Sequence, residues 1–472
     1  MSTNIRADVL WDRLFQSRWV LIALGVVLML GNILYRYPGE LKFDAMMQYD
    51  QVISGVYNDY HPPVMTRLWR ILHPIAAGTA PIYVAHLAMY WFAFILLGYE
   101  LHRRARAISG LIVVTLGATP VLIMMNINVV SDVGLASSFL IVVGLWLQVQ
   151  RRGQWTVATA VIVALLLFYG TLIRANAVFA VPPLLLLIFG SRLSIANLPK
   201  TLVLSALMAV LLIPAASFVN RSVLGASPGG AVRTLQFFDI MGVARLSGDR
   251  SVLGDFAGQY PENVHCYSPV MHDTLAERCK SFTKTVRSSP ELTSIWIGAI
   301  RKHPVSYVEH RLLNLNSAFH FYVPPFHVVL AHENRDHARP PHVSDKGWVV
   351  DNLRSIPILS AASMIVLAVG LFVMVGGAEY RDLTELTAVR GMLTSAILYS
   401  AAFAVVNVAS EQRYALWLMM ATMTSTVIAA PVLKKRLIAR DPTVLVVVSL
   451  LVMVSFVELY ARWTVDTSLT AL

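Results

Sequence analysis

Carboxylates and a histidine gather in one short stretch directly after the first apolar segment of the chain. From Phe43 the sequence reads FDAMMQYDQVISGVYNDYHPPVM, and it contains Asp44, Asp59 and His61. A carboxylate can remove the proton from an attacking hydroxyl group, and a neighbouring acid or histidine can orient that group or tune the carboxylate. These residues therefore suggest catalysis, and the alternative interpretation is a solvated polar connection.

The elements around these residues follow from their spacing. On a helix, Asp44, Gln48 and Gln51 share one face because they stand at i, i+4 and i+7. Such a face suits a polar substrate. Pro62 cannot continue a helix, so we expect His61 to lie at a turn that aims it back toward the carboxylates.

The composition indicates an all-α polytopic membrane protein. Of the 472 residues, 56% are hydrophobic and 14% are charged, compared with about 25% charged in an average soluble domain. The formal net charge is +11. We assign this charge to cytoplasmic anchors and one large outer loop, so anionic lipid is the expected partner and nucleic acid is not.

A helix needs about 20 apolar residues to cross the hydrocarbon core of a bilayer. By this measure the sequence predicts about eleven spans, the sixth of them short. They lie near 19–35, 78–99, 108–126, 133–149, 155–171, 177–190, 201–219, 355–376, 391–409, 414–432 and 443–460.

Basic residues concentrate in alternate loops, which predicts a cytoplasmic N-terminus and an outer C-terminus by the positive-inside rule. The predicted inner loops contain Arg6, Arg13, Arg18, Arg103, Arg104, Arg106, Arg151, Arg152, Arg192, Lys200, Arg381, Arg390, Lys434, Lys435, Arg436 and Arg440. No cleavable signal follows the first apolar segment, so we expect it to remain as span one.

Three parts of the chain are expected. They are a membrane module over 1–219 with a first outer loop at 36–77, a small and mostly helical outer domain over 220–354, and C-terminal membrane helices over 355–472. Cys266 and Cys279 both lie in the outer domain, and in an oxidising compartment such a pair favours a disulfide over a metal or nucleophilic role.

The outer domain also holds two histidine-containing runs, HFYVPPFH from His320 and HENRDHARPPH from His332. Their spacing fits no standard zinc pattern, and a proline-broken polar loop collects histidines without binding metal. We therefore assign no metal ligands.

Further polar clusters lie at the predicted ends of spans, where ionisable groups are costly and often functional. They contain Asp132, Arg174, Asn176, Arg413 and Tyr414. The predicted topology places all of them on the outer face together with the 36–77 loop, which favours one shared pocket. The alternatives are snorkelling of the arginines to lipid headgroups and a structural pair between Asp132 and Arg174.

In order and type, these segments resemble the GT-C class of membrane glycosyltransferases, and a bacterial branch of it in particular. The resemblance rests first on Asp44, Gln48, Gln51, Gly55, Asp59, His61, Pro62 and Pro63. It continues in SDVGLA from Ser131, RANAVFAVPP from Arg174, HPVSYVEHR from His303, and Arg413-Tyr414. Ala45 departs from the family's usual Asp-Ser or Asp-Glu context, which weakens metal ligation there.

The resemblance implies a GT-C-like bundle with an outer, periplasmic active site in a bacterial inner membrane. The donor would be a polyprenyl-phosphate sugar, and the acceptor a lipid- or envelope-linked molecule. Asp44 would be the catalytic base, with Asp59 or His61 orienting the acceptor or tuning Asp44. The expected substrate-binding residues are Gln48, Gln51, Asp132, Arg174, Asn176, His310, Arg311, Arg413 and Tyr414.

Arg174, Arg311 and Arg413 are the candidate phosphate ligands, because a guanidinium fork matches a phosphate and stays charged. No cofactor is required by this chemistry, and a divalent cation is left open. The alternative functions are a transporter or flippase of a lipid-linked saccharide, a glycan ligase or polymerase, and a non-catalytic scaffold. No internal repeat typical of transporters is found in the sequence.

Overall fold

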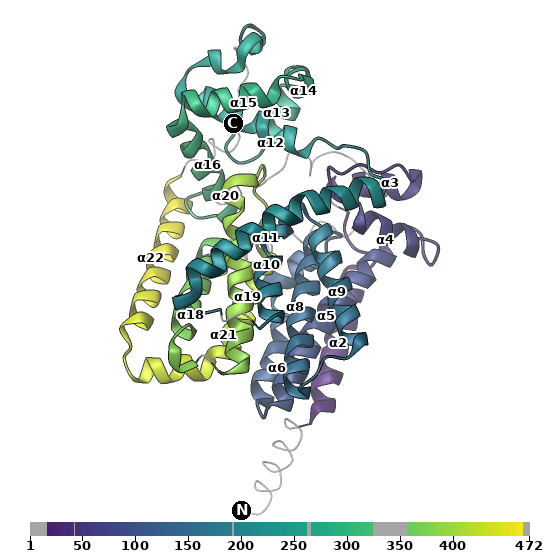
Figure 1. The fold of residues 1–472 in the computed structure, drawn as a ribbon, viewed down its shortest axis with the longest axis vertical. Coiled ribbons are helices and arrows are strands. Elements are labelled where there is room, and N and C mark those ends of the chain that lie inside the picture. The colour runs from purple at the N-terminus through teal and green to yellow at the C-terminus, as the bar shows by residue number, and fades with distance from the viewer. Residues whose placement is uncertain are drawn as a thin grey trace, which may run out of the picture. The chain divides into compact units, whose positions relative to one another are not determined.

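The computed structural model describes residues 17–41, 43–190, 193–261, 266–323, 356–380 and 382–465. Within these ranges the regular structure is helical, with two isolated β-bridges and no strand, which confirms the predicted all-helical class. The chain forms two compact units (Figure 1). Unit 1 comprises Met1–Ser227, Ile365–Tyr399 and Leu416–Val448, and unit 2 comprises Pro228–Met364, Ser400–Ala415 and Ser449–Leu472.

Seven helices among the described residues are long and apolar enough to cross a membrane, as expected for a multi-pass membrane protein. They are Arg18–Arg36, Ala80–Arg103, Ser131–Arg152, Ile195–Val223, Thr384–Val406, Gln412–Ile438 and Pro442–Thr464. The count is eight if the pair Ala107–Leu116 and Pro120–Asn126, bent by 50°, is one span. The predicted count of about eleven is therefore not confirmed.

The remaining predicted spans correspond to shorter helices. The segments 155–171 and 355–376 contain α9 (Val157–Leu172, 16 residues) and α18 (Ala361–Val375, 15 residues). The segment 177–190 contains only the eight residues of α10 (Val181–Ile188) after the 3-10 helix η1 (Ala175–Phe179). At 1.5 Å per residue, eight residues rise about 12 Å, far less than the roughly 30 Å of a hydrocarbon core.

In unit 1, helix α8 (Ser131–Arg152) is central, with 94% of its most apolar window buried. It packs between α5 (Ala80–Arg103) and α9, while α2 (Arg18–Arg36) and α6 (Ala107–Leu116) pack on α5 (Figure 1). The connections from α5 to α6 and from α8 to α9 are short, so the helices of each pair are antiparallel. The other helices of unit 1 are α3 (Phe43–Ser54), α4 (Val64–Leu72), α7 (Pro120–Asn126), α10, η2 (Ile195–Asn197), α11 (Leu198–Phe218), η3 (Val219–Val223), most of α18, η7 (Ala378–Tyr380), α19 (Thr384–Ala401), α21 (Leu416–Ile438) and the start of α22 (Pro442–Thr464).

The antiparallel order gives this bundle two chemically different ends. At the basic end, α5 finishes with His102 and Arg103 and α8 with Arg151 and Arg152, and Arg151 is paired with Glu100 at 2.8 Å. At the other end, here named the α3 end, α2 and α9 finish and α5 and α8 begin. The α3 end therefore receives the loop that contains Asp44.

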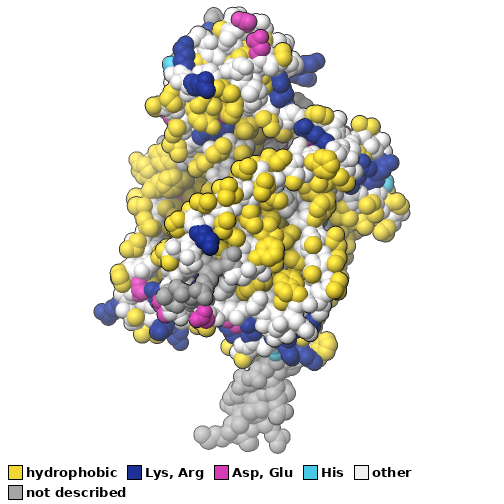
Figure 2. Space-filling view, in the orientation of Figure 1, with side chains coloured by type: hydrophobic (Ala, Val, Ile, Leu, Met, Phe, Trp, Pro, Cys, Tyr) yellow, Lys and Arg dark blue, Asp and Glu magenta, His cyan; other side chains and the backbone are white. Residues whose placement is uncertain are grey.

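Surface hydrophobicity fits a bilayer environment for unit 1. The apolar window of Ile195–Val223 is only 11% buried, so most of α11 faces outward. Figure 2 shows hydrophobic side chains over the surface that α11 crosses. A long apolar helix with so little protein contact requires lipid as its surroundings.

Glycines set the closest approach between α5 and α6. A Cβ added at Gly98 would lie 2.7 Å from the backbone oxygen of Gly110, and one added at Gly110 would lie 2.5 Å from the backbone oxygen of Gly98. Backbone atoms cannot rotate away as a flexible side chain can. Only a residue without a Cβ permits this contact, as at other close helix crossings in membranes.

Gly98→Ala should lower the thermal stability of the detergent-solubilised protein, by about 1–3 kcal/mol, because the added methyl group forces α5 and α6 apart. Gly31→Ala is the matched control, since a Cβ at Gly31 of α2 has no neighbour within 4 Å. A thermal midpoint that falls equally in both variants would contradict this account of the α5–α6 contact.

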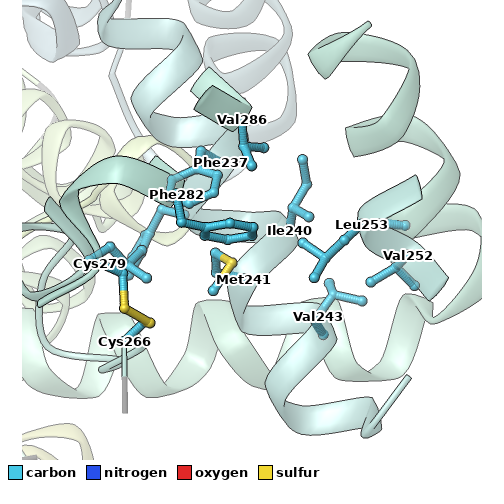
Figure 3. Packing of buried hydrophobic residues seen from close by; sticks show 14 of the residues in the cluster. Phe237, Ile240, Met241, Val243, Val252, Leu253, Cys266, Cys279, Phe282 and Val286 are labelled. Carbon is cyan, nitrogen blue, oxygen red and sulfur yellow. A yellow bond between two sulfur atoms is a disulfide. The ribbon is translucent and has the colours of Figure 1, made fainter. Parts of the chain in front are cut away.

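Unit 2 has its own hydrophobic core around α12 (Ala231–Ser247), shown in Figure 3. Phe237, Ile240 and Val243 of α12 are fully buried in it. The other elements of unit 2 are η4 (Arg250–Gln259), α13 (Asp273–Arg278), α14 (Lys280–Ser288), α15 (Leu292–Lys302), α16 (Pro304–Phe319), η6 (Pro357–Leu359), α20 (Phe403–Val406), η8 (Gln412–Ala415) and the rest of α22.

Candidate functional site

Asp44 and His61 lie together at the α3 end of unit 1. Asp44 is in the first turn of α3, and its Oδ1 is 3.7 Å from His61 Nε2. The Asp44 side chain is 31% exposed and that of His61 is 24% exposed, but the His61 Nε2 atom that faces Asp44 is itself buried. Helix α3 ends at Ser54 and α4 begins directly after Pro63, so His61 lies in the bend predicted from the proline pair.

The amides on the same face of α3 are more buried than Asp44. Gln48 and Gln51 are 3% and 8% exposed. The Gln51 side-chain oxygen accepts a hydrogen bond from the backbone N–H of Asn58 at 3.1 Å, which shapes the loop after α3. The helical face predicted from the i, i+4, i+7 spacing is present, and contact of these amides with a substrate stays a prediction.

Backbone hydrogen bonds hold the ends of this loop. The Glu40 N–H donates to the Ile127 carbonyl oxygen at 3.1 Å, and the Val129 N–H donates to the Glu40 carbonyl oxygen at 2.9 Å. These bonds tie the segment before α3 to the segment before α8. Asp44 and Asp132 follow the two bridged positions by only a few residues, so the bridge places both acids at the same end of unit 1.

Asp59 pairs with an arginine that the sequence analysis did not select. Arg221 Nε lies 2.7 Å from Asp59 Oδ2, and the Arg221 side chain is 50% exposed while that of Asp59 is 13% exposed. A second backbone bridge, between Asn58 and Ser227, brings their segments together. Arg221 lies in η3, directly after the apolar residues of α11, and a charge at the end of a span was the signal that could have identified it.

Asp132 and Arg174 form the ion pair considered in the sequence analysis. Arg174 Nη1 is 2.6 Å from Asp132 Oδ1, and the side chains are 18% and 3% exposed. Asp132 lies in the first turn of α8 and Arg174 directly precedes η1, so the antiparallel α8–α9 pair brings them together. Asn176 is buried in η1. The geometry is compatible with a structural pair and with a ligand-binding pair.

Other buried polar groups of unit 1 also pair with one another. His86 Nε2 is 2.7 Å from the Tyr169 hydroxyl group, and a Cβ at Gly134 would lie 2.8 Å from the same His86 nitrogen. The Asn32 side-chain amide donates to Asn126 Oδ1 at 3.2 Å. Such pairing is required where apolar surroundings replace water.

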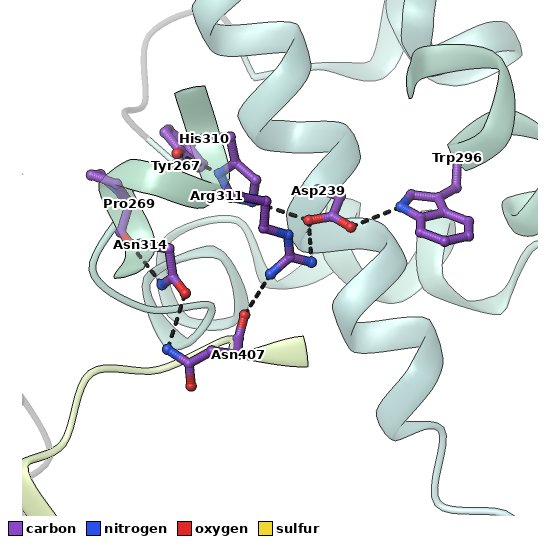
Figure 4. Close-up of polar contacts among 8 residues, drawn as sticks. All are labelled: Asp239, Tyr267, Pro269, Trp296, His310, Arg311, Asn314 and Asn407. Carbon is purple, nitrogen blue, oxygen red and sulfur yellow. Dashed lines mark hydrogen bonds and ion pairs between the residues drawn. The ribbon is translucent and has the colours of Figure 1, made fainter. Parts of the chain in front are cut away.

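In unit 2, His310 and Arg311 of α16 belong to a buried network around Asp239 (Figure 4). Arg311 Nη2 is 2.5 Å from Asp239 Oδ1, and His310 Nε2 is 3.1 Å from the same oxygen. The Trp296 indole N–H donates to Asp239 Oδ2 at 2.8 Å. Asp239 and His310 are fully buried and Arg311 is 6% exposed. Asp239, which anchors the network, is not among the residues predicted from the sequence.

The hydrogen bonds of His310 favour one tautomer. The tautomer with the proton on His310 Nε2 lets this nitrogen donate to the Asp239 carboxylate, and His310 Nδ1 then accepts from the Tyr267 hydroxyl group at 2.8 Å. Burial lowers the pKa of His310 below its ordinary value, although Asp239 opposes that shift. The neutral imidazole therefore satisfies both contacts. Its role as a substrate ligand, and that of Arg311, stays a prediction.

Arg413 and Tyr414 occupy η8 of the same unit. The Arg413 guanidinium donates to both carboxylate oxygens of Glu411, at 2.5 and 2.8 Å, and is 6% exposed. The Tyr414 ring stacks on Phe403 at 5.8 Å between centroids. The predicted site residues thus fall into two groups, one in each unit. That all of them share one pocket stays a prediction.

Cys266 and Cys279 form a disulfide in the core of unit 2, with their Cα atoms 5.7 Å apart. We expect that protein denatured without reductant will not react with an alkylating reagent at either residue, and that both will react once reductant is added. Denaturation is needed because both residues are buried and burial alone would protect thiols. Alkylation of the denatured, unreduced protein would contradict the bridge.

No group of three or more histidine, cysteine, aspartate or glutamate side chains suited to a metal ion occurs among the described residues. Of the two histidine-containing runs, residues 324–327 and 332–342 lie outside the described ranges. In comparisons with known proteins, no family model, no curated protein and no solved structure matches this chain.

Proposed function

We propose that this protein is a membrane glycosyltransferase that moves a sugar from a polyprenyl-phosphate donor to an acceptor hydroxyl group on the outer, periplasmic face of a bacterial inner membrane. The observation that carries the proposal is the partly exposed Asp44 at the α3 end, whose Oδ1 lies 3.7 Å from His61 Nε2. The opposite end of the bundle is basic. The basic end would face the cytoplasm by the positive-inside rule.

The chemistry requires one base. Asp44 would remove the proton of the acceptor hydroxyl group as its oxygen bonds to the anomeric carbon, and the bond from that carbon to the donor phosphate would break. His61, within ion-pair range of Asp44, would stabilise the carboxylate or accept its proton afterwards. The second carboxylate of glycoside hydrolysis is not required, because the leaving phosphate needs no protonation.

The departing lipid phosphate needs positive charge nearby. In unit 1, Arg36, Arg174 and Arg221 are paired with acids at the α3 end, and Arg221 is the most exposed of the three. Asp59 would hold the Arg221 guanidinium in place while its remaining N–H groups meet the phosphate oxygens. A lipid-linked donor accounts for the membrane bundle, since the polyprenyl chain stays in the bilayer while its head group reaches this end.

The test is a donor assay in membranes. Polyprenyl-phosphate sugars of different head groups are supplied with an envelope extract as the acceptor source, and donor loss and free polyprenyl phosphate are measured. We expect equimolar consumption and release for at least one donor. Release of polyprenyl diphosphate from a lipid-linked glycan, with every monosaccharide donor left intact, would instead indicate a glycan ligase.

A further inference from the structure

Helix α16 has an inverted distribution of polar and apolar side chains. Its buried positions include His310, Arg311 and Asn314, with exposures of 0%, 6% and 0%. Its outward positions Val305 and Leu312 are 78% and 59% exposed. A helix on the surface of a water-soluble domain normally shows the opposite pattern, because burial of apolar groups stabilises it.

Helix α14 of the same unit provides an internal comparison. It buries Phe282 and Val286 and exposes Lys280, Lys284 and Thr285. Unit 2 therefore does contain a helix built to face water. The apolar outward face is therefore specific to α16 within unit 2, as expected if that face contacts something other than water.

The outward residues of α16 form a shallow, mostly apolar surface. This surface consists of Pro304, Val305, Val308, Glu309, Leu312 and Leu313. Val308 is 53% exposed, and Glu309 is the one charged residue among the six. The spacing of 305, 308 and 312 keeps the apolar side chains on one stripe along the helix.

Unit 2 is itself continuous with a membrane span. From Ser449 onward, α22 belongs to this unit, and the Ser360 hydroxyl group donates to Glu458 Oε1 of α22 at 2.5 Å. A bilayer surface is thus always close to the unit by covalent connection. The bilayer can therefore cover the apolar face of α16 without a second protein.

Basic residues lie next to the apolar face of α16, where they could contact lipid headgroups. Arg301 and Lys302 end α15 directly before α16 begins, and both are exposed, but Lys302 Nζ is paired with Asp249 Oδ2 at 2.8 Å, which leaves Arg301 as the basic group for headgroups. Basic residues next to an exposed apolar stripe are typical of helices that lie in the interface of an anionic membrane.

We propose that the outward face of α16 is a membrane-docking surface, with Val305, Val308 and Leu312 in the interfacial region and Arg301 at anionic headgroups. This inference does not depend on the proposed transferase activity. It adds a second lipid contact to unit 2 besides α22.

The experiment uses the full chain in vesicles that contain phosphatidylglycerol. A nitroxide label is placed in separate variants at Val308, Leu312 and Lys284, each as a cysteine substitution, and the described residues contain no free cysteine to compete. Collision with oxygen, which concentrates in lipid, is compared with collision with a water-soluble nickel chelate. Labels at Val308 and Leu312 should favour oxygen, and the label at Lys284 on α14 should favour nickel.

Preference for nickel at Val308 and Leu312 would overturn the proposal, because those residues would then face water. Exclusion of both reagents together with dipolar broadening would also overturn it, because a second copy of the chain would cover the face. All three positions are exposed, so the labels should leave the thermal midpoint unchanged. Measurement of this midpoint checks that each labelled protein is folded.

Discussion

Asp44→Asn is expected to lower sugar transfer by about 10²–10⁴-fold, the range that a positioned general base contributes. Asparagine has nearly the same shape as aspartate but cannot accept the acceptor proton. Because Asp44 lies in the first turn of α3 and is partly exposed, its loss should change the thermal midpoint little. The measurement is release of polyprenyl phosphate in membranes with equal amounts of each variant.

Asp50→Asn is the matched control, because Asp50 is on the same helix and is exposed. It makes the same chemical change without touching the Asp44–His61 pair. Activity of Asp44→Asn equal to that of wild type would rule out Asp44 as the base. Equal loss in both variants would attribute the effect to the charge of α3 in general.

Arg311→Met is expected to destabilise the protein by about 3–5 kcal/mol, because it leaves the Asp239 carboxylate buried without its guanidinium partner. Asp239 is fully buried, and Arg311 also donates to the Asn407 carbonyl oxygen at 2.7 Å. Methionine fills a similar volume, so the loss would report mainly on charge. The thermal midpoint of the purified protein measures it.

Arg301→Met controls for the removal of one arginine from the same unit, since Arg301 is exposed. The double variant with Asp239→Asn should lose less stability than the sum of the single variants, because neither member then leaves an unpaired charge. A stable Arg311→Met protein with a raised KM for donor would show instead that Arg311 acts as a ligand.

The class of the fold could be predicted from composition, but the number of spans could not. A hydropathy window scores α10 and the residues around it as apolar and does not detect that a 3-10 helix interrupts them. Likewise it joins α6 and α7, whose axes differ by 50° because Pro120 cannot donate the next helical hydrogen bond. Backbone interruptions of this kind depend on a few residues and carry little weight in an average over many.

The candidate site could be predicted where the partners are close in sequence or lie at the same end of two consecutive antiparallel helices, as Asp132 and Arg174 do across 42 positions. The bend at the proline pair indicated that His61 would turn toward Asp44, and the spacing indicated the helical face of α3. Arg221 pairs with Asp59 across 162 positions, and Asp239 pairs with His310 across 71, so tertiary packing alone brings them together. Charged residues of this kind can be recognised as candidates in a sequence, but their partners cannot.

The bridge between Glu40 and Asn128 consists of backbone groups, and the same holds for the one between Asn58 and Ser227. Any residue other than proline can supply these N–H groups, so side-chain replacement at the bridged positions should leave Asp44 and Asp132 in place. Insertion or deletion of one residue between Glu40 and the start of α3 at Phe43 would instead change the length of this connection by up to about 3.5 Å and displace Asp44 from the bridged segment. In homologues, the lengths of these connections should therefore vary less than the residues that form them.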